Sequence, residues 1–200
     1  MDIDFSLAIV FFTSYGLGCF CAAYYLVRWK TGKDIRDFYS GTAGARNSGR
    51  VLGKSGFFIA LGIDIAKGVL AVSIAHWMLP GDRVAEMLAL GGVMLGHVFP
   101  AQLAFRGGKG VSVLIGATLM VDPLVLLTVG VAAGLVAMLF RRSNQSTVVA
   151  MAVLPFAACW LCDSRATVTG LTLAALMVLF FHRRNIHDIY MAYRFRKGAE

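Results

Sequence analysis

Residues 40–53 bring glycines together with hydroxyl, amide and guanidinium groups. Glycine lets backbone amides approach an anion, and arginine supplies a fork of donors for phosphate oxygens. The segment therefore predicts a phosphate site; the alternative is a flexible basic loop held against anionic lipid headgroups. The positions assigned to catalysis or substrate binding are Ser40, Gly41, Thr42, Gly44, Arg46, Asn47 and Arg50.

A second segment, residues 96–112, places glycines around a lysine immediately before an apolar run. Free backbone donors, a helix amino terminus and an ammonium group then coincide, which suits a phosphate or an acyl phosphate. It is not a Walker A loop, because Gly110 follows Lys109 where that motif has Ser or Thr. Glycines that only end a helix at the membrane surface are the alternative. The candidate residues are His97, Gly107, Gly108, Lys109 and Gly110.

A third segment follows the last apolar run and contains His182 and Asn185. A spacing of three residues places both side chains on one face if the helix continues. An imidazole and a carboxamide there could orient a substrate hydroxyl, whereas helix capping with basic flanking residues explains the same pattern. The sequence does not decide whether a histidine or a substrate phosphate oxygen accepts the hydroxyl proton.

Two charged residues, Asp64 and Lys67, interrupt an apolar run. Each charge costs about 2.5 to 3.5 kcal/mol in the middle of a membrane helix, so both should face other helices. We expect the two residues to pair with each other or with the Arg-rich loop. Structural pairing and a direct catalytic role are the alternatives to the supporting role in substrate binding that we assign to Lys67. Gly92 and Gly96, four residues apart, predict close helix packing.

The composition places these segments in a membrane protein. Hydrophobic residues make up 58% of the 200 residues, charged residues only 15%, and the mean hydropathy is +0.71. About 20 apolar residues span a bilayer as a helix, so we expect an all-α polytopic bundle of about seven transmembrane helices in a single domain, residues 1–200. The predicted spans are 5–27, 57–79, 87–105, 111–121, 123–140, 147–161 and 166–181.

Basic residues predict the orientation of this bundle. Alternate loops and the carboxyl tail carry sixteen Lys and Arg residues, and the loops on the other side carry only Arg83 and Arg165. Because Lys and Arg concentrate on the cytoplasmic side, we expect the amino terminus outside and the carboxyl terminus in the cytoplasm. The net charge of +8 is thus a topological signal, and nucleic acid is not an expected partner. Cys159 and Cys162 have no second pair to complete a metal site, so neither a metal nor a cofactor is expected.

Together the three segments resemble the motifs of the acyl-phosphate:glycerol-3-phosphate acyltransferase (PlsY) family of bacterial membrane proteins. The matching stretches are 40–50, 96–100 with 106–110, and 182–186, and the stretch 64–68 is similar to the family's second span. The resemblance implies seven spans in the bacterial inner membrane and an active site at the cytoplasmic surface. It implies acyl phosphate and glycerol 3-phosphate as substrates, with 1-acyl-glycerol 3-phosphate and phosphate as products.

Carried over residue by residue, the resemblance implies that Arg50 and Lys109 hold phosphates. It implies a catalytic set that binds or orders the substrates: Ser40, His97, His182 and Asn185. The family usually has glycine, asparagine and threonine where this chain has Tyr39, Thr42 and Arg46.

These departures leave room for a divergent enzyme that uses another acyl donor or acceptor. Buried charges and glycine-rich loops could also line the path of a small anion transporter. A scaffold protein in lipid synthesis, which binds these compounds without turning them over, is a third possibility.

Overall fold

The computed structural model describes residues 3–140 and 143–183, and all secondary structure within these ranges is helical. The expected all-α membrane protein is therefore confirmed. Among the described residues, three helical segments are long and apolar enough to cross a bilayer, namely Phe5–Thr31, Ala45–Met78 and Arg83–Leu103. Four shorter apolar helices lie at Val111–Val121, Pro123–Leu139, Gln145–Leu161 and Arg165–Phe181. That all seven segments span the membrane stays a prediction.

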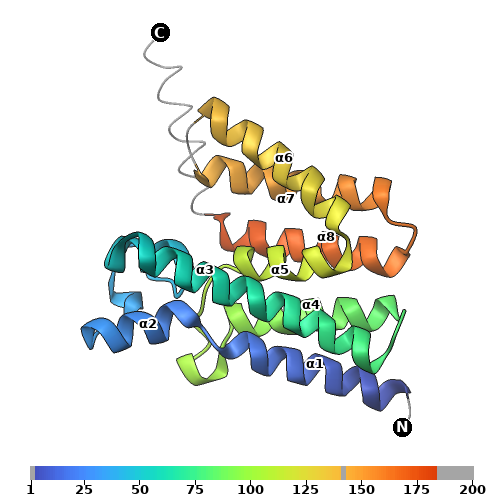
Figure 1. Cartoon of the computed structure of the whole chain (residues 1–200), viewed down its shortest axis with the longest axis horizontal. Helices are drawn as coiled ribbons and strands as arrows, with labels where there is room; N and C mark the ends of the chain where they lie inside the picture. Colours follow the sequence, from blue (N-terminus) through green and yellow to red (C-terminus); the bar gives the residue numbers. More distant parts are fainter. Residues whose placement is uncertain (1–2, 141–142, 184–200) are drawn as a thin grey trace. The chain divides into compact units, whose positions relative to one another are not determined.

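The chain forms two compact units, residues 1–122 and 123–200 (Figure 1). The first contains α1 (Ile3–Cys19), α2 (Ala22–Thr31), α3 (Ala45–Met78), α4 (Arg83–Val98) and α5 (Val111–Val121), with short 3-10 turns η1 (Ile35–Asp37) and η2 (Ala101–Leu103). The second contains α6 (Pro123–Phe140), α7 (Ser143–Leu161) and α8 (Arg165–Phe181).

Small residues bring α1 and α4 together in the first unit. A Cβ atom on Gly96 would lie 2.1 Å from the carbonyl oxygen of Tyr15, and one on Gly92 would lie 2.6 Å from that of Phe11. Larger residues would push the two backbones apart, so the predicted packing role of both glycines is confirmed.

The first predicted span, residues 5–27, lies within the candidate membrane span Phe5–Thr31, but this segment is not one continuous helix. α1 ends at Cys19 and α2 begins at Ala22, so the helix is interrupted at Phe20 and Cys21. A helix leaves its last carbonyl groups unpaired, and such groups need a donor inside a membrane. Lys67 of α3 supplies it, because its ammonium donates to the carbonyl oxygens of Gly18 and Phe20. The break therefore depends on a residue almost fifty positions away.

The second predicted span, residues 57–79, begins too late. α3 starts at Ala45, so much of the predicted phosphate loop is helical, and the helix bends at Gly53, whose φ is 76°. That left-handed conformation suits a residue without a Cβ atom. Consequently Arg46, Asn47 and Arg50 project from the first turns of α3 and not from a flexible loop.

The remaining spans are close to the prediction. α5 covers the predicted residues 111–121 and stops at Asp122. Pro123, which has no backbone N–H, then starts α6 in the first-turn position where that loss is harmless. α4 ends at Val98, and the rest of its predicted span, residues 87–105, folds as a turn followed by η2.

Candidate functional site

The first loop (residues 40–44) is held in place by one buried amide. Asn47 is 1% exposed, and its Nδ2 lies 3.0 Å from the carbonyl oxygen of Ile35, 3.1 Å from that of Phe38 and 3.0 Å from that of Thr42. A side-chain amide has two donor hydrogens, so the three carbonyls share them. These contacts give Asn47 a structural task, and its predicted role as a substrate ligand stays a prediction.

The first loop presents polar groups to the exterior. Ser40 is exposed, and its hydroxyl lies 3.1 Å from that of Thr42. Gly41 has a φ of 66°, and Gly44 precedes the first turn of α3 as its N-cap. The loop therefore places hydroxyl groups and backbone donors next to the amino terminus of α3.

Two guanidinium groups follow on α3. Arg46 and Arg50 are both exposed, and the guanidinium carbon of Arg50 lies 5.9 Å from the ring centre of Tyr39. Tyr39 itself has a φ of 45°, a left-handed conformation that glycine adopts more easily. The tyrosine thus occupies a strained position and supplies an aromatic face to Arg50.

The second loop (residues 106–110) lies against the end of α4. Gly107 and Gly108 donate backbone hydrogen bonds to the carbonyl oxygens of Val98 and His97, each over 3.0 Å. A Cβ atom on Gly107 would lie 2.0 Å from the His97 carbonyl oxygen. Glycine is therefore required at both positions, because the second loop passes very close to His97 at the end of α4. Lys109 follows in a half-buried position, and Gly110, with a φ of 86°, is the N-cap of α5.

A backbone hydrogen bond joins the two loops. The amide of Ala43 donates to the carbonyl oxygen of Gly107 over 3.1 Å. Each loop leads directly into a helix, α3 or α5, whose first-turn amides have no acceptor within the helix. The arrangement brings two helix amino termini and their basic side chains to one side of the first unit, which suits binding of anionic groups.

An ion pair in η1 helps to link η1 with η2 beside the two loops. Arg36 in η1 contacts Asp34 at 2.6 Å and donates to the carbonyl oxygen of Leu103 over 2.7 Å, so it links η1 to η2. Hydrogen bonds from Arg36 lower the pKa of the Asp34 carboxyl group, and the same contact raises the pKa of Arg36. Arg36 was not among the residues predicted from the sequence; the pattern Asp34-x-Arg36 was the available signal.

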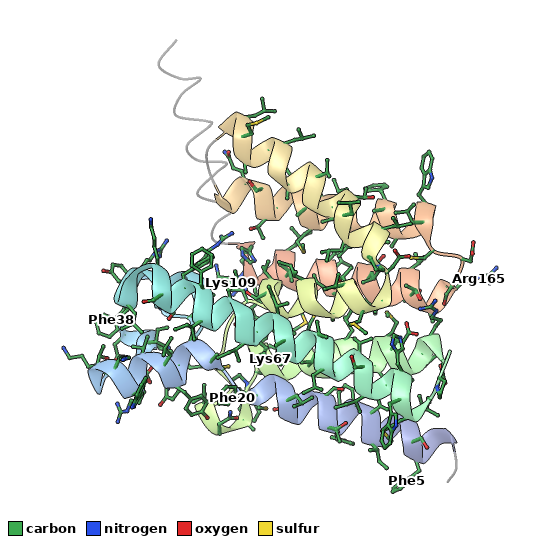
Figure 2. All side chains as sticks on the ribbon, viewed as in Figure 1. Phe5, Phe20, Phe38, Lys67, Lys109 and Arg165 are labelled. Atoms are coloured by element: carbon green, nitrogen blue, oxygen red, sulfur yellow. The ribbon has the colours of Figure 1, made fainter. Side chains whose placement is uncertain are left out.

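A buried cluster of charged and polar groups lies behind the second loop. Lys67 is 6% exposed, and its Nζ lies 3.0 Å from Oδ1 of Asp64 and 2.9 Å from Nδ1 of His97. Asp64 and His97 are also buried. Figure 2 labels Lys67 near Phe20, at the break between α1 and α2. The expected pairing of Asp64 with Lys67 is thus found.

In the second unit, His182 is the C-cap of α8 and is 3% exposed. Its Nδ1 lies 2.9 Å from the carbonyl oxygen of Val178. Because a carbonyl only accepts, Nδ1 carries the proton, and Nε2 of the neutral ring is an acceptor. Asn185 lies outside the described residues. That His182 and Asn185 complete the site stays a prediction.

Similarity to known proteins agrees with these features. The family model described as glycerol-3-phosphate acyltransferase matches residues 8–192. Glycerol-3-phosphate acyltransferase 1 of Bacillus cereus is 36% identical over 169 residues, which cover 84% of this chain and 91% of that protein. Glycerol-3-phosphate acyltransferase of Staphylococcus aureus is 30% identical over 191 residues, covering 92% of this chain and 94% of that protein.

Solved structures share the fold. The crystal structure of PlsY (YgiH), an integral membrane glycerol 3-phosphate acyltransferase, in its glycerol 3-phosphate form has a TM-score of 0.88 and 24% identity. The match covers 94% of this chain and 93% of that chain. The lysophosphatidic acid form has a TM-score of 0.84 and 22% identity. With the family match across nearly the whole sequence, the conclusion is that this chain belongs to the glycerol-3-phosphate acyltransferase family.

Proposed function

We propose that this protein transfers a fatty acyl group from acyl phosphate to glycerol 3-phosphate and releases inorganic phosphate. The observation that carries the proposal is the hydrogen bond between Ala43 and Gly107, which sets the amino termini of α3 and α5 together. Two phosphorylated substrates need such paired anion sites. Family membership supplies the acyl acceptor, and the donor is what the resemblance of the three motifs to the acyl-phosphate-dependent family implies.

The reaction requires positioning and charge neutralisation more than a protein nucleophile. The glycerol hydroxyl oxygen attacks the acyl carbonyl carbon, a new C–O bond forms, and the C–O bond to phosphate breaks. Phosphate leaves with the bonding electrons, and the hydroxyl proton goes to a base or to a phosphate oxygen. Acyl phosphate is already activated, so Arg50, Lys109 and the helix amino termini stabilise its charge while both substrates are held in line.

His182 and His97 have different proposed roles because different ring nitrogens are engaged in hydrogen bonds. Nε2 of His182 accepts, because Nδ1 of that ring donates to Val178. His182 is therefore the candidate to take the hydroxyl proton. Nδ1 of His97 faces the ammonium of Lys67, so His97 is not available as a base through that nitrogen. The proposal assigns both compact units to one acyltransferase domain, residues 1–200.

The membrane side of the site is inferred from charge. Arg50, Lys109 and His182 lie in or beside the segments whose basic residues are predicted to face the cytoplasm. The proposal accordingly places the site at the cytoplasmic surface of the bacterial inner membrane, with the amino terminus outside. Cysteine substitutions at exposed positions in an otherwise cysteine-free protein, labelled in intact cells and in inverted vesicles, test this orientation.

A turnover assay tests the reaction. Purified protein in lipid nanodiscs receives palmitoyl phosphate and glycerol 3-phosphate, and phosphate release is measured beside formation of the acylated product. We expect both products in equal amounts, and little of either from the Lys109→Ala variant. A folded wild-type protein that forms neither product contradicts the proposal. Counterflow of labelled phosphate in liposomes without acyl transfer would favour a transporter instead.

A divergent acceptor is the second candidate, and Tyr39 and Arg46 favour it. Tyr39 holds a left-handed conformation beside Arg50, and Arg46 adds a positive charge where the family has a hydroxyl group. An acceptor screen with glycerol 3-phosphate and other phosphorylated polyols decides between the two candidates. Turnover that is faster with another acceptor, and that shifts toward glycerol 3-phosphate when Tyr39→Gly and Arg46→Thr are combined, supports the second.

A further inference from the structure

The ammonium group of Lys67 has a defined set of acceptors. It donates to the carbonyl oxygens of Gly18 over 3.1 Å and Phe20 over 2.8 Å, and it lies 2.9 Å from Nδ1 of His97. An ammonium has three donor hydrogens and no acceptor, so these three partners and the Asp64 carboxylate, whose Oδ1 lies 3.0 Å away, share them. The Lys67 side chain is 6% exposed, and this arrangement is shielded from water.

Asp64 forms an ion pair in this cluster but does not orient the His97 ring through a hydrogen bond. Its Oδ1 lies 3.0 Å from the Lys67 ammonium and 3.7 Å from Nδ1 of His97. Within the described part of the chain, neither carboxylate oxygen makes a hydrogen bond with acceptable geometry. The Asp64 carboxylate lies beside the Lys67 ammonium, and such pairing offsets the cost of an isolated charge in a membrane interior. The orientation of the His97 ring is therefore set by Lys67.

The protonation of His97 follows from its neighbour. Since the ammonium cannot accept, Nδ1 of His97 must, and the neutral ring then carries its only proton on Nε2. A second ring proton would point at Lys67 and is excluded by like charge. The Cys21 thiol donates to the backbone oxygen of His97 over 3.6 Å. One tautomer is consequently fixed.

The Nε2 atom of His97 faces the second loop. A Cβ atom on Gly108 would lie 2.1 Å from Nε2, so this nitrogen lies directly against the backbone of Gly108. Gly108 also donates its amide to the carbonyl oxygen of His97. The ring edge and the loop backbone are thereby held in fixed register, one residue before Lys109.

We propose that Lys67 is a positioning residue which fixes His97 in the tautomer with its proton on Nε2, so that a neutral N–H reaches the phosphate group of the acyl donor held at the second loop. This inference rests on the proposed function and deepens it. A neutral, buried donor keeps its hydrogen bond to an anionic phosphate throughout the reaction and does not exchange its proton with the hydroxyl group. Preorganised donors of this kind strengthen charge stabilisation in a water-poor site.

Nitrogen NMR of histidine tests the tautomer independently of activity. In protein labelled with 15N-histidine, we expect the His97 ring to show the Nε2–H pattern around neutral pH, and the His97→Gln variant identifies its signals by their absence. Lys67→Met should give that ring a mixture of tautomers or a proton uptake on acidification. Lys54→Met, at an exposed position on α3, is the matched control and should leave the spectrum unchanged. A wild-type His97 ring with its proton on Nδ1, or a His97 signal that Lys67→Met does not alter, overturns the proposal.

Kinetics test the donor. Gln at position 97 places an amide N–H close to the Nε2 position, whereas Asn places its amide near Nδ1 and leaves the second loop without a donor. We expect His97→Asn to lower kcat/KM for palmitoyl phosphate about 100-fold, the size of a lost charge-stabilising donor, and His97→Gln to retain about ten times more activity than Asn. Equal losses in two folded variants would mean that the ring only fills space, and would overturn the donor role.

A double-mutant cycle tests whether Lys67 acts through His97. Lys67→Met should lower kcat/KM about tenfold or more in the wild type and much less in the His97→Asn background, because coupled residues are not additive. Equal losses in both backgrounds contradict a role through His97. A wild type that lacks turnover but shows the expected NMR pattern would overturn the proposed function while still supporting the tautomer fixed by Lys67.

Discussion

The backbone amide of Ala43 donates to the carbonyl oxygen of Gly107 over 3.1 Å and so ties two glycine-rich loops that are more than sixty residues apart in the chain. The contact is main chain to main chain, so no side-chain pattern announces it. It places the amino termini of α3 and α5 where both can meet anionic groups. Residues around this contact should therefore control substrate binding and the stability of the two loops.

Removing the ammonium at position 109 should weaken binding of the phosphorylated donor. A charge-assisted hydrogen bond contributes about 1.5 to 3 kcal/mol, so Lys109→Ala should raise KM for palmitoyl phosphate roughly 10- to 100-fold. Steady-state kinetics in nanodiscs measure this change. Lys54→Ala removes an exposed lysine from α3 and should leave KM unaltered. An equal rise in KM for both variants would point to loss of overall positive charge.

Asn47→Ala should destabilise the fold. Three backbone carbonyls lose the amide that they share in a site that is 1% exposed, and unpaired buried groups cost about 1 to 3 kcal/mol. We expect a lower free energy of unfolding in mild detergent, together with reduced activity. Ser55→Ala removes only one weak hydroxyl contact of 3.5 Å and is the control. Normal stability with lost activity would instead assign Asn47 to substrate binding.

Gly108→Ala should abolish activity. The added methyl group would occupy space 2.1 Å from Nε2 of His97, so the ring and the second loop must separate. Strain of this kind costs typically about 1 to 3 kcal/mol. Gly62→Ala, at a helical position with nothing within 4 Å, should preserve activity and raise stability by roughly 0.5 to 1 kcal/mol. An active Gly108→Ala enzyme would show that the ring and loop need not touch.

The Asp34–Arg36 ion pair should make stability depend on acidic pH. Arg36 holds the pKa of the folded carboxyl group below its unfolded value of about 3.9, so the contribution is complete above that value and disappears as the pH falls through the folded pKa. Both side chains are partly exposed, so we expect less than about 1 kcal/mol. Unfolding curves at several acidic pH values should show this loss in the wild type. Asp34→Asn should be less stable at neutral pH and should lose less on acidification; an identical pH profile would rule out the pair as the cause.

Tyr39→Gly should keep or increase stability. Tyr39 has a φ of 45°, a conformation that costs a side-chain residue roughly 1 to 2 kcal/mol and glycine little. The same change removes the ring beside Arg50, so KM for the substrate phosphate should change about two- to fivefold. Denaturation and kinetics on one preparation separate the two effects. A loss of stability would show that the ring contact outweighs the backbone strain.

The sequence by itself determined the class of protein and most helix positions. Long apolar runs are sufficient, because each apolar residue lowers the transfer free energy into lipid independently of its distant neighbours. The boundary between α5 and α6 at Asp122 and Pro123 was likewise determined by local sequence, since proline lacks the backbone N–H needed inside a helix. The motifs also indicated the family, because glycine and basic residues at fixed spacing describe a phosphate loop.

Only the tertiary structure decided which buried groups meet. The break after α1 lies within an apolar run, and it is stable because the Lys67 ammonium satisfies the carbonyl groups of Gly18 and Phe20. Asp64 is the helical neighbour of Lys67, as its spacing suggests, but His97 comes from another helix. Hydrogen bonds between distant segments depend on how the helices pack, and packing is a property of the whole unit that local composition does not encode.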